Sequence, residues 1–256
     1  MLTFSNKPRP RGGRWPNRLI WLSLIILLLA AMLIIGSGPT YRLGWLSLGE
    51  SFSLLRRGAQ LALGGAAIAM LSSLVALLCR RWRIMLASLL TATAALALIS
   101  TPLQMQHIGR SVPPIHDIST DTVNPPAFET LAPARRAAPN AVDYPGEATA
   151  RQQKRAYPQL DSLILNIPVT EALSAAEITA REQGWEIASV NANQIEATAS
   201  TRWFGFKDDV IIRLTQAPQG VLIDVRSASR LGKSDLGTNA ARIQTYLEAL
   251  KARVEG

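Results

Sequence analysis

The chain has 256 residues, 48% of them hydrophobic, and a formal net charge of +9. This length accommodates one membrane region and one globular domain. Many of the cations flank apolar runs, which is typical of membrane topology and argues against a nucleic-acid partner. The single cysteine, Cys79, excludes an internal disulfide and a thiol-based metal cluster.

A basic tail over residues 1–18 precedes three apolar segments. The first is about 17 residues long, close to the lower limit for crossing a bilayer of about 30 Å. A signal peptide is the alternative for this segment, but the residues after Ile35 make a poor small-x-small cleavage site. We therefore predict three transmembrane helices in a lipid bilayer, at residues 19–35, 58–79 and 84–100.

The cations indicate an orientation for these helices. The tail and the turn Arg80–Arg83 are the two strongest cationic clusters, and three spans place both on one side of the membrane. Because cations favour the cytoplasmic side, we expect a multi-pass protein of the bacterial inner membrane. Its N-terminus would be cytoplasmic and its C-terminal domain periplasmic. Arg56 and Arg57 run against this rule, since they adjoin the second span on the opposite side.

The second apolar segment carries small residues at helical spacing. Ala62, Gly65, Ala66 and Ala69 recur at intervals of three and four, which places them on one helix face. Small residues let helices approach closely in lipid. This face is a candidate interface of a membrane assembly, and the alternative is that Ala and Gly are simply common in such helices.

Residues 101–157 are rich in proline, which disfavours long helices. Composition alone predicts an extended linker. From about residue 111, however, apolar side chains such as Ile115 and Phe128 alternate with turn-forming residues. We therefore expect this later part to pack on the surface of the domain.

Residues 158–256 show regular periodicity. We predict a first helix over 171–183 with Thr170 as its cap, and a second from Thr238 onward. Alternation of apolar and polar residues predicts strands at 163–167, 185–190, 194–203, 210–214 and 221–225. Short connections between the strands predict an α+β fold, a mainly antiparallel sheet with two helices on one face, after three transmembrane helices.

One hairpin can be aligned by its turn, Ala217–Gly220. If Gln216 pairs with Val221, then Arg213 lies opposite Asp224. One interpretation is a solvated ion pair on an open sheet face. The other is that Arg202, Arg213 and Arg226 form a cationic floor for an anionic ligand, because a guanidinium binds carboxylate or phosphate with two donors.

The connection from Arg226 to Asn239 extends this hypothesis. Arg226 and Arg230 come just before a helix N-terminus, which favours anions, and Ser234 or Thr238 would cap that helix. The alternative is a turn network, in which polar side chains bind backbone amides. Our candidate ligand-binding residues are Arg202, Arg213, Arg226, Arg230, Ser234, Asp235 and Asn239.

The signals for catalysis and for metal are weak. His116, Asp117 and Asp121 lie on one short segment with no fourth ligand, so a turn brace is favoured over a metal site. Asp208 and Asp209 form a candidate carboxylate pair for acid–base chemistry. We assign no catalytic residue, metal or cofactor.

Several ordered motifs resemble the bacterial family called domain of unknown function 1499. The resemblance covers about residues 111–254 and implies membrane or envelope association, but it supplies no activity. The motifs are Ile115–Asp121, Asn124–Phe128, Tyr157-Pro158, Gly184-Trp185, Trp203–Asp209, Arg226–Asn239 and Arg242-Ile243.

The leading hypothesis is a membrane-anchored envelope protein whose periplasmic domain binds an anionic small molecule or a partner protein. One alternative is a hydrolase or transferase that uses Asp208, Asp209 or Asp235 with Arg226 and Arg230. Another is a structural subunit of a membrane assembly.

Overall fold

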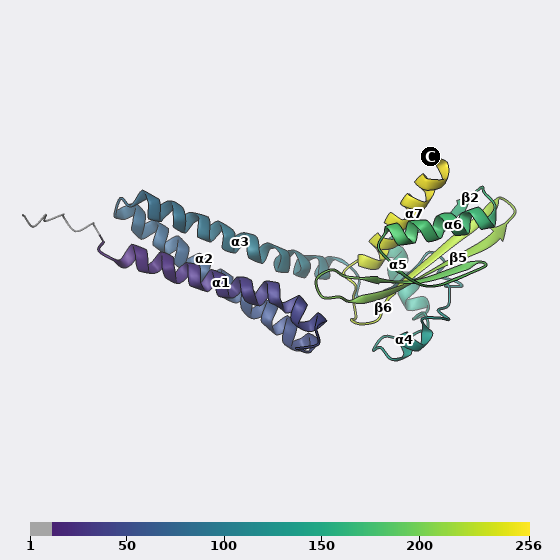
Figure 1. The fold of residues 1–256 in the computed structure, drawn as a ribbon, viewed down its shortest axis with the longest axis horizontal. Helices are drawn as coiled ribbons and strands as arrows, with labels where there is room; N and C mark the ends of the chain where they lie inside the picture. Colours follow the sequence, from purple (N-terminus) through teal and green to yellow (C-terminus); the bar gives the residue numbers. More distant parts are fainter. Residues whose placement is uncertain (1–11) are drawn as a thin grey trace, which may run out of the picture. The chain divides into compact units, whose positions relative to one another are not determined.

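The computed structural model describes residues 12–256. Its contacts divide the chain into two compact parts, unit 1 up to Gln106 and unit 2 from His107. Helices make up unit 1, whereas unit 2 combines helices with a sheet (Figure 1). Three cations of the predicted tail lie outside the described residues, namely Lys7, Arg9 and Arg11.

Three helices are long and apolar enough to cross a membrane, which confirms the predicted apolar region. They are longer than predicted. The predicted spans left residues 36–57 as a connecting loop between the first two helices, but all of these residues except 43–47 are helical. A capping box explains the early start of the second helix: Ser47 N–H donates to Glu50 Oε2 at 2.8 Å, and Glu50 N–H donates to Ser47 Oγ at 3.3 Å. The helices are α1 (Trp15–Arg42), α2 (Leu48–Leu78) and α3 (Trp82–Ser111).

Proline restricts residues 101–157 less than predicted. Helix α3 continues through Pro102 to Ser111, and two further helices, α4 (Ala132–Arg136) and α5 (Glu147–Ala156), follow. In α4 the proline occupies the first turn, where its missing N–H costs no helix bond. The expectation of an extended segment is therefore wrong for these stretches.

The small residues of α2 pack on α1 of the same chain. Ala62 and Ala69 are fully buried, and a Cβ on Gly65 would lie 3.1 Å from the side chain of Ile26. Close helix approach of this kind needs small side chains. The face predicted as an assembly interface is therefore covered by α1 of the same chain.

Unit 2 is an α+β domain whose six-stranded sheet is antiparallel throughout. The strand order is β1-β6-β5-β4-β3, and β2 also pairs with β6. Two helices, α6 (Val169–Glu182) and α7 (Thr238–Glu255), cover one face, which confirms the predicted fold class (Figure 1). The strands are β1 (Asp117–Ser119), β2 (Leu163–Leu165), β3 (Glu186–Asn191), β4 (Gln194–Ser200), β5 (Lys207–Ala217) and β6 (Gly220–Ser229).

The two faces of this sheet differ in chemistry. Apolar side chains of β4, β5 and β6 pack under α6 and α7, where Trp185 stacks on Tyr246 with ring centroids 4.9 Å apart. The opposite face carries charged side chains and is covered by residues 120–145, which we call the strap. Phe128 and Leu131 of the strap pack there on Ile211.

The predicted hairpin register is confirmed. Gln216 pairs with Val221 and Arg213 with Asp224. The predicted helix cap is wrong, because α6 begins at Val169 with Pro168 in the cap position. The extended backbone of Pro168, with ψ 147°, suits that position.

Candidate functional site

Four arginines and four aspartates meet between the strap and the charged face of the sheet. Every one of them belongs to at least one salt bridge, so the charges of this cluster balance. Its members are Arg135, Arg213, Arg226, Arg230, Asp117, Asp121, Asp209 and Asp224. We call this set the ionic cluster.

Arg226 is the centre of the ionic cluster and is only 2% exposed. Its guanidinium binds both carboxylate oxygens of Asp117, at 2.9 and 2.8 Å. It also donates to the strap carbonyls of Pro126 (3.0 Å) and Val142 (2.8 Å). The ring of Phe128 lies 4.9 Å from the guanidinium carbon. One side chain of β6 therefore holds β1 and two separate points of the strap.

Asp209 joins two arginines. Arg135 donates to it at 3.1 Å, and Arg230 donates to both of its oxygens, at 2.9 and 2.8 Å. Burial lowers the pKa of Arg135, although Asp209 acts in the opposite direction. The hydrogen bond to Asp209 raises the pKa of Arg230. An arginine side chain is not deprotonated in proteins, so both guanidinium groups are charged at neutral pH.

Arg213 bridges two carboxylates, those of Asp121 (2.9 Å) and Asp224 (2.8 Å). Partial burial alone would raise the pKa of Asp121, but the N–H groups of Asn124 and Val123, together with Arg213, lower it below its ordinary value. Because Asp121 belongs to the strap, this pair also ties the strap to the sheet.

Glu196 is a buried carboxylate of this face whose contacts with the strap the sequence analysis missed. It is fully buried on β4 and accepts hydrogen bonds from Glu129 and Thr130 (2.9 Å each) and Leu131 (2.8 Å). Those N–H groups belong to Leu131, the residue before α4, and to the two residues ahead of it. The alternation on β4 showed a polar outward position but not the strap that covers it.

The loop after β6 has the contacts of a turn network. The carboxylate of Asp235 accepts from the N–H groups of Gly237 (2.9 Å) and Asn239 (2.7 Å), and Ser234 Oγ accepts from Leu236 (3.2 Å). Burial raises the pKa of Asp235. The cap residue of α7 is Gly237, which corrects the prediction of Ser234 or Thr238.

Asn239 is fully buried behind this loop. Its side chain donates to the carbonyl of His116 at 2.9 Å and to Ser229 Oγ at 3.0 Å, and it accepts from Ser227 Oγ at 2.7 Å. These bonds of Asn239 join the segment before β1 to the end of β6. Nearby, Arg242 forms a salt bridge with Asp208 at 2.6 Å.

The structure does not bring the three arginines of the predicted cationic floor together. Arg202 lies in the turn between β4 and β5, beyond the pair Ser200–Lys207, whereas Arg213 pairs with Gln194 at the other end of β4. Six residue steps along a strand separate these ends by about 20 Å. A floor that contains both Arg202 and Arg213 is therefore not formed.

The weak metal candidates have other contacts. Asp117 and Asp121 bind Arg226 and Arg213, respectively. Among residues 12–256, no group of three or more metal-binding side chains is present. The carbonyl of His116 accepts from Asn239, and its Nδ1 is buried without a hydrogen-bond partner.

A separate groove lies on the surface of unit 2. Its volume is about 560 Å³, and the strap and α5 form its walls. It is lined by Thr122, Val123, Pro125, Tyr144, Gly146, Glu147, Ala150, Arg151 and Lys154. We call it the α5 groove.

The α5 groove combines apolar and cationic side chains. Val123 is 80% exposed, Ala150 is buried, and Arg151 and Lys154 are exposed on α5. Burial raises the pKa of Tyr144 to about 12, so its phenol stays neutral. The Tyr144 hydroxyl has no hydrogen-bond partner in the described part of the chain.

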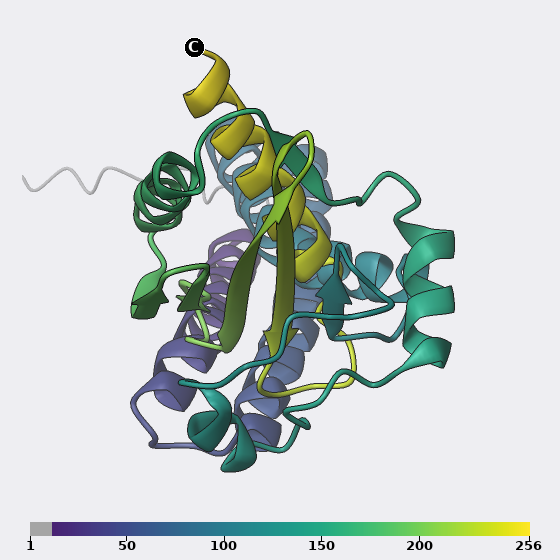
Figure 2. The ribbon, with the colours of Figure 1, turned by 90° about the vertical axis from the view of Figure 1, so that its right-hand side faces the viewer.

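Helix α5 is held firmly beside β1 (Figure 2). The N–H of Ser119 donates to Gln153 Oε1 at 3.0 Å, and Gln153 Nε2 donates to the Ser119 carbonyl at 2.7 Å. Gly146 precedes the helix with φ +89°, a backbone conformation that favours glycine. The groove wall is therefore attached to the edge of the sheet.

The fold and the ionic cluster define an α+β domain preceded by three apolar helices. The family model described as "Protein of unknown function (DUF1499)" matches residues 117–250. This match spans more than half of the chain, so the chain belongs to that family, as the motifs suggested.

Other comparisons add little. No curated protein matches the chain. Among solved structures, the crystal structure of CalU16 from Micromonospora echinospora is 16% identical, with a TM-score of 0.21. That similarity covers 37% of this chain and 86% of CalU16.

Proposed function

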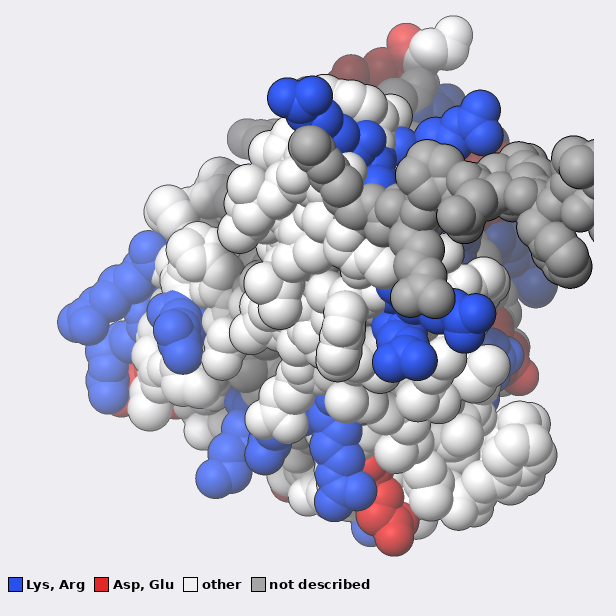
Figure 3. Space-filling model, turned by 90° about the vertical axis from the view of Figure 1, so that its left-hand side faces the viewer, with Lys and Arg blue, Asp and Glu red and all other residues white. Residues whose placement is uncertain are grey.

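We propose that the chain is a membrane-anchored binding protein of the bacterial envelope. Its three apolar helices would cross the inner membrane, with the N-terminus in the cytoplasm and unit 2 in the periplasm. Arg14 and Arg18 of the tail and the turn Arg80–Arg83 support this orientation, because they lie at the same end of unit 1. There Arg81 donates to the carbonyl of Gly13 at 3.0 Å. The face of the molecule drawn in Figure 3 shows many Lys and Arg side chains and few Asp and Glu side chains. Cations favour the cytoplasmic side.

The ligand of unit 2 would be an anion with an apolar portion, bound in the α5 groove. The observation that carries this proposal is the exposed Lys154 beside apolar groove walls. Arg151 already has a carboxylate partner, Glu147, at 2.6 Å. Lys154 takes part in none of the salt bridges between described residues, so its charge is open to a ligand.

The ionic cluster would then support the site rather than form it. Arg213, Arg226 and Arg230 already bind carboxylates, and a ligand would have to displace those partners. Removing one member of a buried ion pair costs about 3–5 kcal/mol. The candidate carboxylates of a hydrolase or transferase also have partners. Asp208 and Asp209 form salt bridges, and Asp235 accepts hydrogen bonds from backbone amides.

The test uses the full chain in lipid nanodiscs and hexyl phosphate as an anionic, partly apolar probe. Hydrogen exchange of the α5 amides is the measure of binding. We expect the probe to slow exchange, and we expect the affinity to fall about tenfold in Lys154→Gln, the scale of one lost charged hydrogen bond. Inorganic phosphate, which lacks the apolar part, should bind more weakly.

Arg155→Gln is the matched control, because Arg155 is exposed on the same helix but does not line the groove. It should bind like the parent chain. Equal losses in both variants would indicate a general charge effect and contradict the site. If hexyl phosphate leaves exchange unchanged while a photo-crosslinker at residue 154 captures an envelope protein, the partner is a protein instead.

A further inference from the structure

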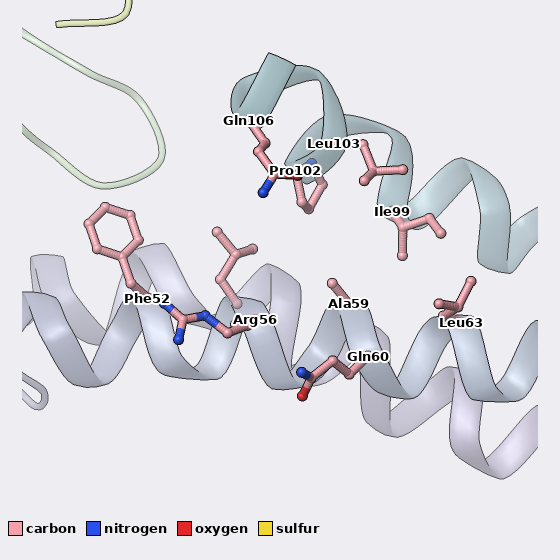
Figure 4. A pocket seen from close by; sticks show the side chains of 10 residues that line it. Phe52, Arg56, Ala59, Gln60, Leu63, Ile99, Pro102, Leu103 and Gln106 are labelled. Atoms are coloured by element: carbon pink, nitrogen blue, oxygen red, sulfur yellow. The ribbon is translucent and has the colours of Figure 1, made fainter. Parts of the chain in front are cut away.

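Unit 1 contains a second concave site, on the flank of its helices. It lies between α2 and α3 and has a volume of about 500 Å³ (Figure 4). Ala59 and Leu63 of α2 face Ile99 and Leu103 of α3 across it, and Arg56 and Gln106 lie toward one end. We call it the α2–α3 groove.

The groove exists because the two helices separate along their length. Near their connecting turn, Ser72 and Ser88 are hydrogen-bonded at 2.8 Å. Further along, Ile99 is 7% exposed and packs with Ala62, but Leu103 is 56% exposed. Between them Pro102 lacks the N–H that would continue the helix bonds. The space beyond Ile99 is therefore not filled by the helices themselves.

Arg56 carries a charge that unit 1 does not neutralise. Glu50 is the single acidic residue between positions 1 and 106. Its carboxylate already accepts from the backbone and hydroxyl of Ser47. Arg56 takes part in none of the salt bridges of residues 12–256. A cation within a membrane helix is costly unless it is paired, which makes such a residue a candidate for function.

The dimensions suit one leaflet of a bilayer. From Arg56 to Leu63 the helix rises about 10 Å. One leaflet contributes about 15 Å of the hydrocarbon core, so this rise covers roughly two thirds of it. An anionic group at Arg56 would therefore have an apolar wall of this length beside it. Gln106, on the opposite helix, adds an amide donor at the same end.

We propose that the α2–α3 groove binds an acyl chain of an anionic phospholipid, with the lipid phosphate on Arg56 and Gln106. This inference rests on the membrane insertion proposed above, but not on the α5 groove. It also explains why Arg56 lies on the side of the membrane that the cation rule disfavours.

The experiment is native mass spectrometry of the full chain released from nanodiscs. The nanodiscs contain equal amounts of phosphatidylglycerol and phosphatidylcholine with identical acyl chains. We expect phosphatidylglycerol to be retained about tenfold more, the scale of one charged hydrogen bond. This preference should disappear in Arg56→Gln and persist in Arg57→Gln, because the exposed Arg57 does not line the groove.

A second variant tests the groove independently of charge. Ala59→Trp fills the space between the helices and should remove both retained lipids, with helix content by circular dichroism unchanged. Retention of lipid by Ala59→Trp, equal effects of Arg56→Gln and Arg57→Gln, or a dimer in place of a lipid adduct would each overturn the lipid site. A chain that fails to enter nanodiscs would overturn the membrane insertion itself.

Discussion

Arg226 shows how one buried charge organises the domain. Its guanidinium donates four hydrogen bonds, two to the Asp117 carboxylate and two to strap carbonyls, and two rings lie against it. Arg226→Ala leaves Asp117 buried without its partner. We expect the free energy of unfolding to fall by about 3–5 kcal/mol. Hydrogen exchange of the β6 amides in the full chain measures this loss.

A double variant separates the charge from the packing. Asp117→Leu with Arg226→Met replaces the pair by apolar side chains of similar size. Such replacements are often neutral or stabilising, so the double variant should be more stable than Arg226→Ala alone. A loss below about 1 kcal/mol in Arg226→Ala would contradict a structural role and restore this arginine as a ligand-binding residue.

Asp121 makes the attachment of the strap depend on pH. Its pKa in the folded chain is lowered below 3.8, so its stabilising contribution is present above that value. The contribution is lost as the pH falls through the lowered pKa. Because the carboxylate is partly exposed, we expect less than about 1 kcal/mol.

The measurement is hydrogen exchange of the Val123 and Asn124 amides, which donate to Asp121 at 2.9 Å each. At pH 7, Asp121→Asn should exchange faster than the parent chain, and the difference should vanish as the pH falls through the lowered pKa of Asp121. The control is Asp161→Asn, since Asp161 is exposed. A difference that persists in acid would show that the carboxylate charge is not responsible.

At the scale of the elements, local patterns in the sequence predicted the strands. They did not predict contacts between residues that are far apart in the sequence. The β5–β6 register followed from a turn at Pro218, because Arg213 and Asp224 are only 11 positions apart. The bonds from Arg135 to Asp209 and from Leu131 to Glu196 join residues 74 and 65 positions apart. Such pairs depend on the path of the strap, which no periodicity shows.

The packing of α1 on α2 gives a prediction for neighbouring glycines. A Cβ on Gly65 would lie 3.1 Å from Ile26, whereas nothing lies within 4 Å of one on Gly64. Gly65→Leu should therefore separate the helices and cost about 1–3 kcal/mol, as overpacking does. Gly64→Leu should be tolerated.

The thermal unfolding midpoint of the full chain in detergent compares these two variants. Equal midpoints would indicate that α1 and α2 are not held by this close approach. A lower midpoint for Gly64→Leu alone would place the sensitive face on the other side of α2.

For the whole molecule, apolar runs predicted three helices but not their ends. Helix α2 begins before its apolar residues because the capping box at Ser47, rather than hydropathy, determines where it begins. The charged face of unit 2 was predicted as open and is covered. Alternation shows that a strand has two faces, but it does not show what lies on the polar one.

The orientation of the whole chain is tested by cysteine labelling in a Cys79→Ser background. Lys233→Cys probes unit 2, and Arg83→Cys probes the beginning of α3; both positions are exposed. We expect a membrane-impermeant maleimide to label position 233 in intact spheroplasts and position 83 only after permeabilisation, because one span, α3, lies between the two positions. Labelling of both positions from one side would contradict a membrane-spanning α3. Labelling in the reverse order would invert the orientation and place the α5 groove in the cytoplasm.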